Sequence, residues 1–284
     1  MKNILPYLIA VLLVSCTTVT DITPPAYASK LVVNGLLSNE ESIRVSISYS
    51  VVALSQDQPQ YLSDAVVEVW EDGTSLGKGT YNTFDKVYEW SQVPKAGSNY
   101  RVRVEHKDYP VIDQSLDMPS ANAFSKIIYE DSIGLDSSGL AKAAITIHLA
   151  DPSNETNYYR LNFGYYNSTI PGFLPITFET NDAILLAPST VKEDDGSYLF
   201  NDQLFNGQTR DIKVTFTRDI ALSTPRFLVL GESLSEDLYL YQYSIALYQS
   251  SKNNFISEPV IIHNNIKGGL GIWAGKITER DTIY

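Results

Sequence analysis

Hydrophobic and polar residues alternate along much of this 284-residue chain, which is the pattern of a β-strand with one buried face. Ile43, Val45, Ile47 and Tyr49 fall on one face of such a strand, and Arg44, Ser46 and Ser48 occupy the positions between them. Further strand signals mark the segments 31–37, 64–71, 100–106, 144–150 and 158–166. The Asp72-Gly73 pair is a typical hairpin turn. The pattern predicts a mainly β protein.

The length and the spacing of the strands favour two domains. Residues 30–118 are expected to form an Ig-like β-sandwich of about seven strands. The order of AVVEVWEDG and VPKAGSNYRVRVEH also resembles the transthyretin-like or carboxypeptidase-regulatory sandwiches of cell-envelope proteins. The segment DMPSANAFSK is the expected boundary, and residues 124–284 are expected to form a second β-rich domain. Within it, the segments 211–217 and 226–232 predict a hairpin around Ser223-Thr224-Pro225.

One amphipathic helix is expected in the second domain, near residues 234–250. Ser233 and Glu236 have the spacing of a capping box at its start. The apolar stripe expected along the helix consists of Leu238, Tyr241, Ile245 and Tyr248.

The N-terminus has the features of a lipoprotein signal peptide. Lys2 precedes a short apolar run that ends in Leu-Val-Ser-Cys, the order of a bacterial lipobox, so residues 1–15 are expected to be removed. Cys16 would then be the first residue and the site of lipid attachment. Residues 16–29, with two prolines, read as an extended tether. The chain is expected to be anchored in the outer membrane, on a face that the sequence leaves open.

The composition narrows the range of partners. The formal net charge is −12, and removal of Lys2 with the signal peptide makes it −13. A strongly acidic surface argues against nucleic acid as a partner. Cys16 is the only cysteine, so no disulfide can form within the molecule.

No set of residues has the spacing of a catalytic or metal site, so no cofactor and no enzymatic activity are expected. His106, His148 and His263 are scattered, and His148 is expected on the surface of a strand. The acidic segment with Glu193, Asp194, Asp195, Asn201 and Asp202 lacks the spacing of a helix-loop-helix calcium loop. An ordinary acidic turn is the simpler interpretation.

Two other groups of residues admit a structural and a functional interpretation. The glycines of NIKGGLGIWAG do not have dinucleotide-binding spacing and more simply allow a late strand to bend or to approach its neighbour closely. The aromatic residues could form platforms for sugars or partner proteins, or could pack core and rim. They are Trp70, Trp90, Tyr158, Tyr159, Tyr165, Tyr166 and Trp273.

Two tripeptides, centred on Ser132 and Thr282, resemble the Asp-Ser/Thr-aliphatic acceptor of O-glycosylation in exported Bacteroidota proteins. Short patterns of this kind also occur by chance, and Thr282 lies almost at the end of the sequence.

The second half contains a recognisable order of motifs: DPSNETNYYRLNF, YLFNDQLFNGQTRDIKVTF, LSEDLYLYQYSIALYQ and EPVIIHNNIKGGLGIWAG. Together with the lipobox and KLVVNGLL, this order resembles a Bacteroidota lipoprotein family known as domain of unknown function 4249. The resemblance implies an outer-membrane lipoprotein, often encoded beside TonB-dependent receptors, with an accessory role in ligand capture. It supplies no catalytic or ligand-binding residues.

Three functions remain open. The first is a non-enzymatic binding subunit that helps a TonB-dependent transporter gather an unknown small ligand. The second is a fimbrillin-like adhesin, which would require an arginine-directed cut, and Arg44 falls inside a predicted strand. The third is a glycan-active enzyme, which the absence of a convergent acid pair makes the weakest.

Overall fold

The computed structural model describes residues 28–52, 57–120, 123–153, 155–166, 173–176, 178–217, 226–252 and 259–283. The described part of the first half forms β1 (Leu31–Ser38), β2 (Arg44–Tyr49), β3 (Val66–Glu71), β4 (Thr74–Lys78), β5 (Thr80–Asn82), β6 (Val87–Glu89), β7 (Asn99–His106) and β8 (Tyr109–Asp117). The second half forms β9 (Phe124–Leu135), β10 (Ala141–Ala150), β11 (Tyr158–Tyr166), β12 (Phe173–Pro175), β13 (Val191–Lys192), β14 (Tyr198–Asn201), β15 (Thr209–Thr217), β16 (Arg226–Leu234), α2 (Glu236–Ser251) and β17 (Leu270–Ile283). The expected mainly β fold with one helix is confirmed for these residues.

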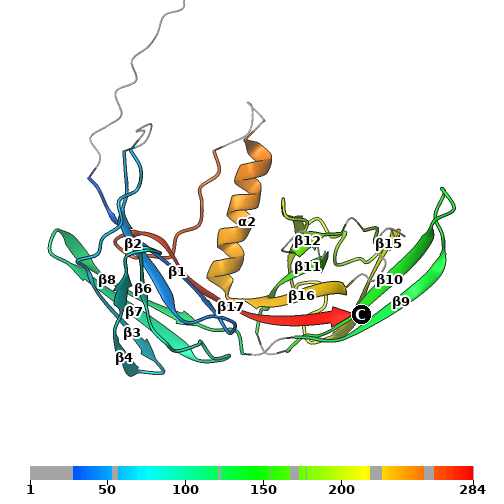
Figure 1. Ribbon diagram of the computed structural model, residues 1–284, viewed down its shortest axis with the longest axis horizontal. Helices are drawn as coiled ribbons and strands as arrows, with labels where there is room; N and C mark the ends of the chain where they lie inside the picture. The colour runs from blue at the N-terminus through cyan, green and yellow to red at the C-terminus, as the bar shows by residue number, and fades with distance from the viewer. Residues whose placement is uncertain are drawn as a thin grey trace, which may run out of the picture.

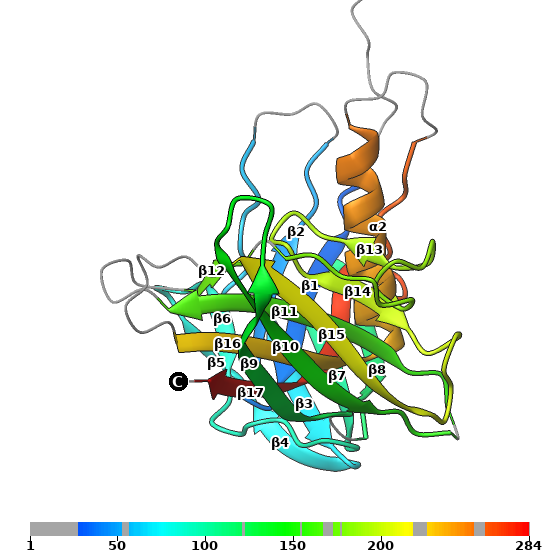
Figure 2. The same ribbon diagram turned by 90° about the vertical axis from the view of Figure 1, so that its right-hand side faces the viewer.

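One ten-stranded sheet runs through both halves of the molecule, in the order β13-β14-β11-β16-β17-β1-β2-β6-β5, with β12 paired to β11. A four-stranded sheet, β4-β3-β7-β8, packs against its N-terminal part, and a three-stranded sheet, β15-β10-β9, packs against its C-terminal part. The two resulting sandwiches lie side by side in Figure 1, with β17 passing from one to the other. Figure 2 shows the same layers after a quarter turn.

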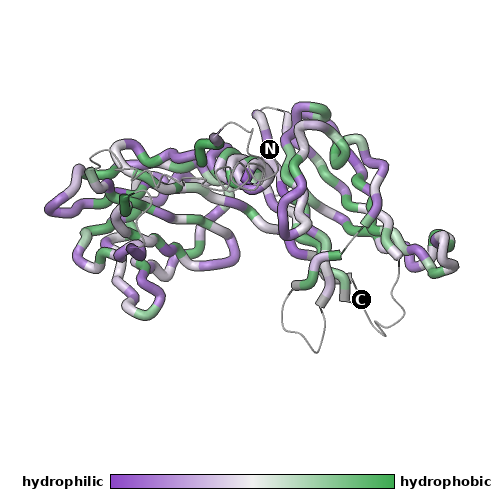
Figure 3. Tube along the Cα trace, turned by 90° about the horizontal axis from the view of Figure 1, so that it is seen from above, coloured by the Kyte–Doolittle hydropathy of each residue, from purple (hydrophilic) through white to green (hydrophobic). Residues whose placement is uncertain are grey.

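The two faces of the long sheet carry different layers, because successive side chains of a strand point to opposite sides. On β17, Trp273 and Ile277 belong to the core of the first sandwich, whereas Ile272 and Ala274 pack against α2. The helix therefore covers the face opposite the two smaller sheets. Figure 3 shows it end-on between the two lobes.

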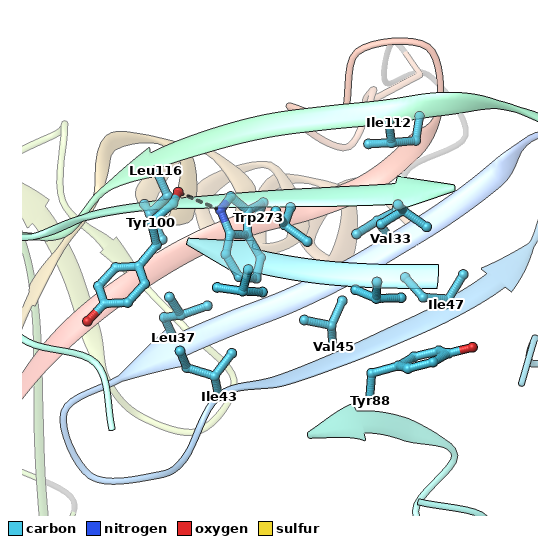
Figure 4. Close-up of a cluster of buried hydrophobic side chains, with 14 of the residues drawn as sticks. Val33, Leu37, Ile43, Val45, Ile47, Tyr88, Tyr100, Ile112, Leu116 and Trp273 are labelled. Carbon is cyan, nitrogen blue, oxygen red and sulfur yellow. Dashed lines mark hydrogen bonds between the residues drawn. The ribbon is translucent and has the colours of Figure 1, made fainter. Parts of the chain in front are cut away.

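Parallel pairing of β1 with β17 connects the start of the described chain to its end. Seven residue pairs are in register, from Val32 with Leu270 to Ser38 with Lys276. Trp273 is fully buried, and its Nε1 donates to the Tyr100 carbonyl oxygen, 3.1 Å away in the opposing sheet (Figure 4). The strand from the C-terminal half thus completes the first sandwich.

Close approach of β17 to its neighbours requires glycine. A Cβ on Gly271, which has φ +113°, would lie 2.1 Å from the Val33 carbonyl oxygen. A Cβ on Gly275 would lie 2.2 Å from Met118 Sδ. The interpretation of the glycine-rich segment as a strand that approaches a neighbour closely is confirmed.

Local predictions from alternation hold well. Ile43, Val45 and Ile47 are all buried, and so are the inward positions of β3 and β7. The pattern fails at the end of β2, where Tyr49 is only partly buried and Ser48, expected on the outer face, is 6% exposed. Asp72 and Gly73 both have positive φ, +49° and +79°, at the β3–β4 turn, which is the backbone geometry of a type I′ hairpin. The helix lies within two residues of its predicted ends.

Three predictions about the helix and the strands that precede it are wrong. The expected hairpin does not form, because β15 pairs with β10 while β16 pairs with β11 and β17. Ser233 does not cap α2, since it lies within β16; Ser235 is the cap and accepts a hydrogen bond from the Leu238 amide at 3.4 Å. The apolar stripe is buried only at Leu238, and Tyr248 is 47% exposed because the distal part of the helix stands clear of the sheet.

Replacing Gly271 by alanine is expected to destabilise the protein by more than about 4 kcal/mol, because backbone strain adds to a clash with β1. Gly134→Ala is the matched control, since Gly134 also has positive φ, +136°, but a Cβ there meets nothing within 4 Å. The control should cost about 1–2 kcal/mol from φ alone. Urea unfolding followed by tryptophan fluorescence measures both values, and equal losses would contradict the close-approach explanation.

Candidate functional site

A polar cleft of about 540 Å³ lies at the junction between the two sandwiches. Four separate segments line it: the turn before β7, the connection from β8 to β9, the loop from β10 to β11, and the start of α2. Its charged lining residues are the carboxylates of Asp117, Glu155 and Glu236, and its described lining includes no lysine, arginine or histidine. The charged groups of the cleft are therefore all hydrogen-bond acceptors.

Tyr158 lines this cleft, and its hydroxyl lies near a carboxylate of the cleft. The hydroxyl donates to Glu236 Oε1 at 3.2 Å. Burial, with the nearby Glu236 charge, raises the pKa of Tyr158 to about 12, so the phenol stays neutral and remains a donor. The Ser120 hydroxyl, also in the lining, donates to Glu155 Oε1 at 3.1 Å. Two of the three carboxylates are thus held in place by neighbouring hydroxyls.

A row of alternating charges crosses the ten-stranded sheet beside α2. Arg160 on β11 contacts Glu232 on β16 at 3.0 Å, and Lys276 on β17 also pairs with Glu232. On its other side Arg160 pairs with Glu193 and Asp195. The Glu232 side chain is only 4% exposed, so its charge depends on these partners.

The acidic turn identified in the sequence therefore has a structural partner. Burial by itself would lower the pKa of Arg160, but the surrounding carboxylates outweigh it and the pKa is raised. Burial would likewise raise the pKa of Glu232, but Lys276 and Arg160 outweigh it and the pKa lies below its ordinary value. The turn around Gly196 supplies counter-charges to a partly buried arginine.

A second acidic pair fixes the loops beside the cleft. Asp151 accepts from the Tyr159 hydroxyl and from the Gly207 amide, the latter at 2.7 Å. Asp202 accepts from the Asn157 amide at 2.9 Å. Burial, with a smaller contribution from Asp151, raises the pKa of Asp202. These bonds tie the loop from β10 to β11 to the turn after β14.

Comparison with known protein families identifies the chain over most of its length. The model described as "Domain of unknown function (DUF4249)" matches residues 17–280. The chain belongs to the DUF4249 family. No curated protein matches the sequence significantly. Among solved structures, a crystal structure of a Salmonella alpha-2-macroglobulin mutant aligns with 12% identity and a TM-score of 0.24, covering 92% of this chain and 15% of that chain. So low a TM-score carries no conclusion about fold.

The motif residues that carry the resemblance to DUF4249 have structural roles. Phe200 and Phe205 are buried in the second core, where both lie near the Tyr159 ring. Gly207 has φ +71°, and a Cβ there would lie 2.6 Å from Ser153 Cβ. The segment FNDQLFNG of this DUF4249 chain therefore builds the turn beside the cleft.

Each histidine of this DUF4249 chain lies beside at least one aspartate, and the three histidines lie apart in sequence and on different strands or loops. His106 contacts Asp64 at 3.2 Å, His148 contacts Asp211 at 2.7 Å, and His263 contacts Asp237 at 2.8 Å. His148 is partly exposed on β10, as its strand position predicts. Within the described residues no group of three or more His, Cys, Asp or Glu side chains is arranged to hold a metal ion.

The structure does not gather the aromatic residues into one platform. Trp273, Trp90 and Tyr159 are buried in the cores. Trp70 is partly covered by the Arg101 guanidinium, 4.9 Å from the ring centre, and Tyr165 packs against the second core. The Tyr166 side chain lies outside the described part. Among those described, Tyr158 and Tyr159 line the cleft.

The predicted modification sites occupy different environments. Cys16 lies outside the described residues. Ser132 is exposed on β9, where four residue steps, from Glu130 to Gly134, face two steps on β10. This bulge carries the acceptor tripeptide away from the ladder. Thr282 lies in β17, where its backbone is paired with Leu228.

The cleft itself escaped prediction from sequence. Its carboxylates come from positions 117, 155 and 236, which share no local pattern. Across the described residues, no helix has both the length and the apolar character needed to cross a bilayer.

Replacing Arg160 by leucine is expected to lower the free energy of unfolding by about 3 kcal/mol, because it leaves Glu232 buried with Lys276 as its remaining partner. Arg44→Leu is the control, since Arg44 also sits on a strand beside two carboxylates, Asp85 and Glu89, but is exposed to solvent that screens the charges. A much smaller loss is expected there. Chemical denaturation near neutral pH measures both.

The difference in unfolding free energy between wild type and Arg160→Leu is expected to depend on pH in a definite direction. Because the pKa of Glu232 is lowered in the folded state, its contribution is complete above the ordinary glutamate pKa of 4.5 and is lost as the pH falls through the lowered folded value. The gap between wild type and Arg160→Leu should therefore narrow below pH 4.5. A gap that stays constant in acid would mean that arginine packing, not charge, is responsible.

Proposed function

We propose that this chain is a Bacteroidota cell-envelope lipoprotein that acts as a non-enzymatic binding subunit beside a TonB-dependent outer-membrane transporter. Acyl chains on Cys16 would hold it in the outer membrane. The lipobox before Cys16 and the resemblance of the motif order to that family support this proposal. Residues 17–280, which the family model matches, start directly after the proposed anchor.

The junction cleft is the observation that carries a binding role. Its walls come from both sandwiches, which share one continuous sheet. The side chains that would bind a ligand are therefore held on a rigid frame. Hydroxyl groups orient two of its carboxylates, at Glu155 and Glu236. A site with pre-oriented acceptors binds without a large ordering cost.

The chemistry of the cleft favours a ligand that donates hydrogen bonds. A polyhydroxylated or cationic small molecule would satisfy Asp117, Glu155 and Glu236, whereas an anion would be repelled. This property is consistent with capture of a polar nutrient before its transfer to a transporter.

The adhesin alternative conflicts with the position of Arg44. A cut at Arg44 would detach β1, which lies between β2 and β17 in the middle of the long sheet. Loss of that strand would expose the unpaired edge of β17 and the Trp273 core. The binding role requires no such rearrangement.

Cross-linking in native outer membranes tests the proposal. Lys192 and Lys252 are exposed and should give links to a TonB-dependent receptor, while Lys142 should react less because it pairs with Glu179 at 2.6 Å. A Cys16→Ser variant is the control, because it should lose both the acyl group and the links. Mass spectrometry of the linked peptides identifies the partner.

Three outcomes are informative. Links from Lys192 or Lys252 to receptor loops would support the accessory role. Links only between copies of the chain would favour the adhesin. Wild-type protein that fractionates with the membrane yet gives no specific link would contradict the association with a transporter.

We also propose that Ser132 is an O-glycosylation site, since the bulge on β9 exposes it. Protein isolated from its natural host should lose the mass of one glycan on Ser132→Ala substitution. Ser138→Ala, in the exposed turn at the end of the same hairpin, is the control and should leave the mass of the glycan unchanged. An intact mass that the acylated polypeptide alone accounts for would contradict the proposal.

A further inference from the structure

The distal half of α2 differs from the rest of the surface. The helix carries two acidic residues, Glu236 and Asp237, in its first turn, and its remaining fourteen residues, 238–251, are uncharged. No acidic residue occurs between Asp237 and Glu258, and Lys252 follows the helix. In a chain of net charge −12, this helix end is therefore free of carboxylates.

Apolar side chains on this end are open to solvent. Leu247 is 38% exposed and Tyr248 is 47% exposed. Ile261 is 88% exposed in the segment that returns beside the helix, two residues before His263, whose amide donates to Ser244 at 2.9 Å. The described residues leave Leu247 and Tyr248 partly open to solvent and Ile261 almost fully open.

The helix end points in the same direction as the start of the described chain. Figures 1 and 2 show the start of β1 and the C-terminal end of α2 at one end of the molecule, with the β3–β4 hairpin at the other. Ala28 follows Cys16 by twelve residues, which allows a reach of at most about 40 Å at ~3.3 Å per residue. A lipid on Cys16 would keep this end toward the bilayer.

The composition of the helix end suits the interfacial layer of a membrane. Tyrosine is enriched where hydrocarbon meets headgroups, because its ring is apolar and its hydroxyl is wet. Carboxylates would be repelled by anionic headgroups, and a lysine would be attracted. Tyr248, Leu247 and Lys252 meet these conditions, whereas the acidic base of the helix lies at the junction cleft.

We propose that the distal half of α2, with Leu247, Tyr248 and Ile261, rests in the headgroup layer of the membrane that anchors the chain. This assignment rests on the proposed lipid anchor at Cys16. The contact fixes the orientation of the molecule: α2 stands on the bilayer, and the β3–β4 hairpin points away from it. A protein partner at the same surface is the competing occupant.

Site-specific labelling tests the orientation. Once Cys16 is acylated the chain has no free thiol, so Tyr248→Cys provides a unique site for an environment-sensitive fluorophore. Acylated protein is placed in phosphatidylethanolamine–phosphatidylglycerol vesicles that contain brominated lipids, which quench at short range. Because an interfacial helix face enters the headgroup boundary by about 5–10 Å, quenching at position 248 should be about threefold greater than at a distant site. Thr74→Cys, exposed in the β3–β4 hairpin, is that distant control.

The possible results distinguish failure of the membrane contact from failure of the proposed lipid anchor. Vesicle flotation without a difference between the two labels would overturn the membrane contact and leave the anchor intact. Failure to float would overturn both. Quenching at position 248 that is lost when outer-membrane proteins are added to the vesicles would assign the surface to a protein partner instead.

A charged variant checks that the apolar side chains cause the contact. Leu247→Glu should reduce quenching of a label at Ile261→Cys to the level of the Thr74→Cys control, without loss of flotation. Gln249→Glu, which adds the same charge at another exposed position of the last turn, should have a weaker effect. Equal effects would mean that charge alone governs the distance, and would count against burial of Leu247.

Discussion

The parallel pairing of β1 with β17 is the interaction on which the rest of the structure depends. It brings together residues about 240 positions apart and places Trp273, from the C-terminal half, in the core of the first sandwich. Beyond β1, the Asn39 side chain continues the ladder, since its amide donates to the Thr278 carbonyl and accepts from the Thr278 amide. β17 then pairs with β16 for the rest of its length. Loop closure over such a distance has a cost that grows only slowly with length, so one well-packed strand can join the two halves.

Features that depend on neighbouring residues could be predicted from the sequence, whereas pairings between distant segments could not. Alternation of Ile43, Val45 and Ile47 identified a buried strand face, and Asp72-Gly73 identified a turn, because each depends on neighbouring residues. The pairing of β16 with β11 and β17, instead of β15, depends on which faces pack together, and no local pattern encodes it. The sequence pattern did not identify Ser235 as the helix cap for the same reason. The Ser235 hydroxyl also accepts from the Gly275 amide on β17, and this tertiary contact favours Ser235 over Ser233 as the cap. The junction cleft combines four such distant segments and was beyond prediction.

On the face of the sheet that α2 covers, some strand positions that would ordinarily carry apolar side chains carry acidic and basic residues instead. Arg160, Glu232 and Lys276 lie on neighbouring strands beside the apolar contacts of the helix base, Leu238 and Tyr239. A buried ion row of this kind contributes little net stability compared with apolar residues, but it is costly to disturb and therefore favours one arrangement of the strands. The acidic turn after β13 belongs to this arrangement, which removes it from the set of candidate ligand sites.

The two ends of α2 serve different chemical environments. Glu236 lies in the polar cleft and Asp237 holds His263, so the first turn is fixed to the body through carboxylates. The last turns carry no charge and leave Leu247 and Tyr248 exposed. A sixteen-residue helix is about 24 Å long at 1.5 Å per residue. If the distal half of the helix rests in the headgroup layer, the rigid helix sets the height of the cleft above the membrane. A ligand held at the helix base would then lie less than about 24 Å from the headgroups, at a level that extracellular or periplasmic loops of a transporter can reach.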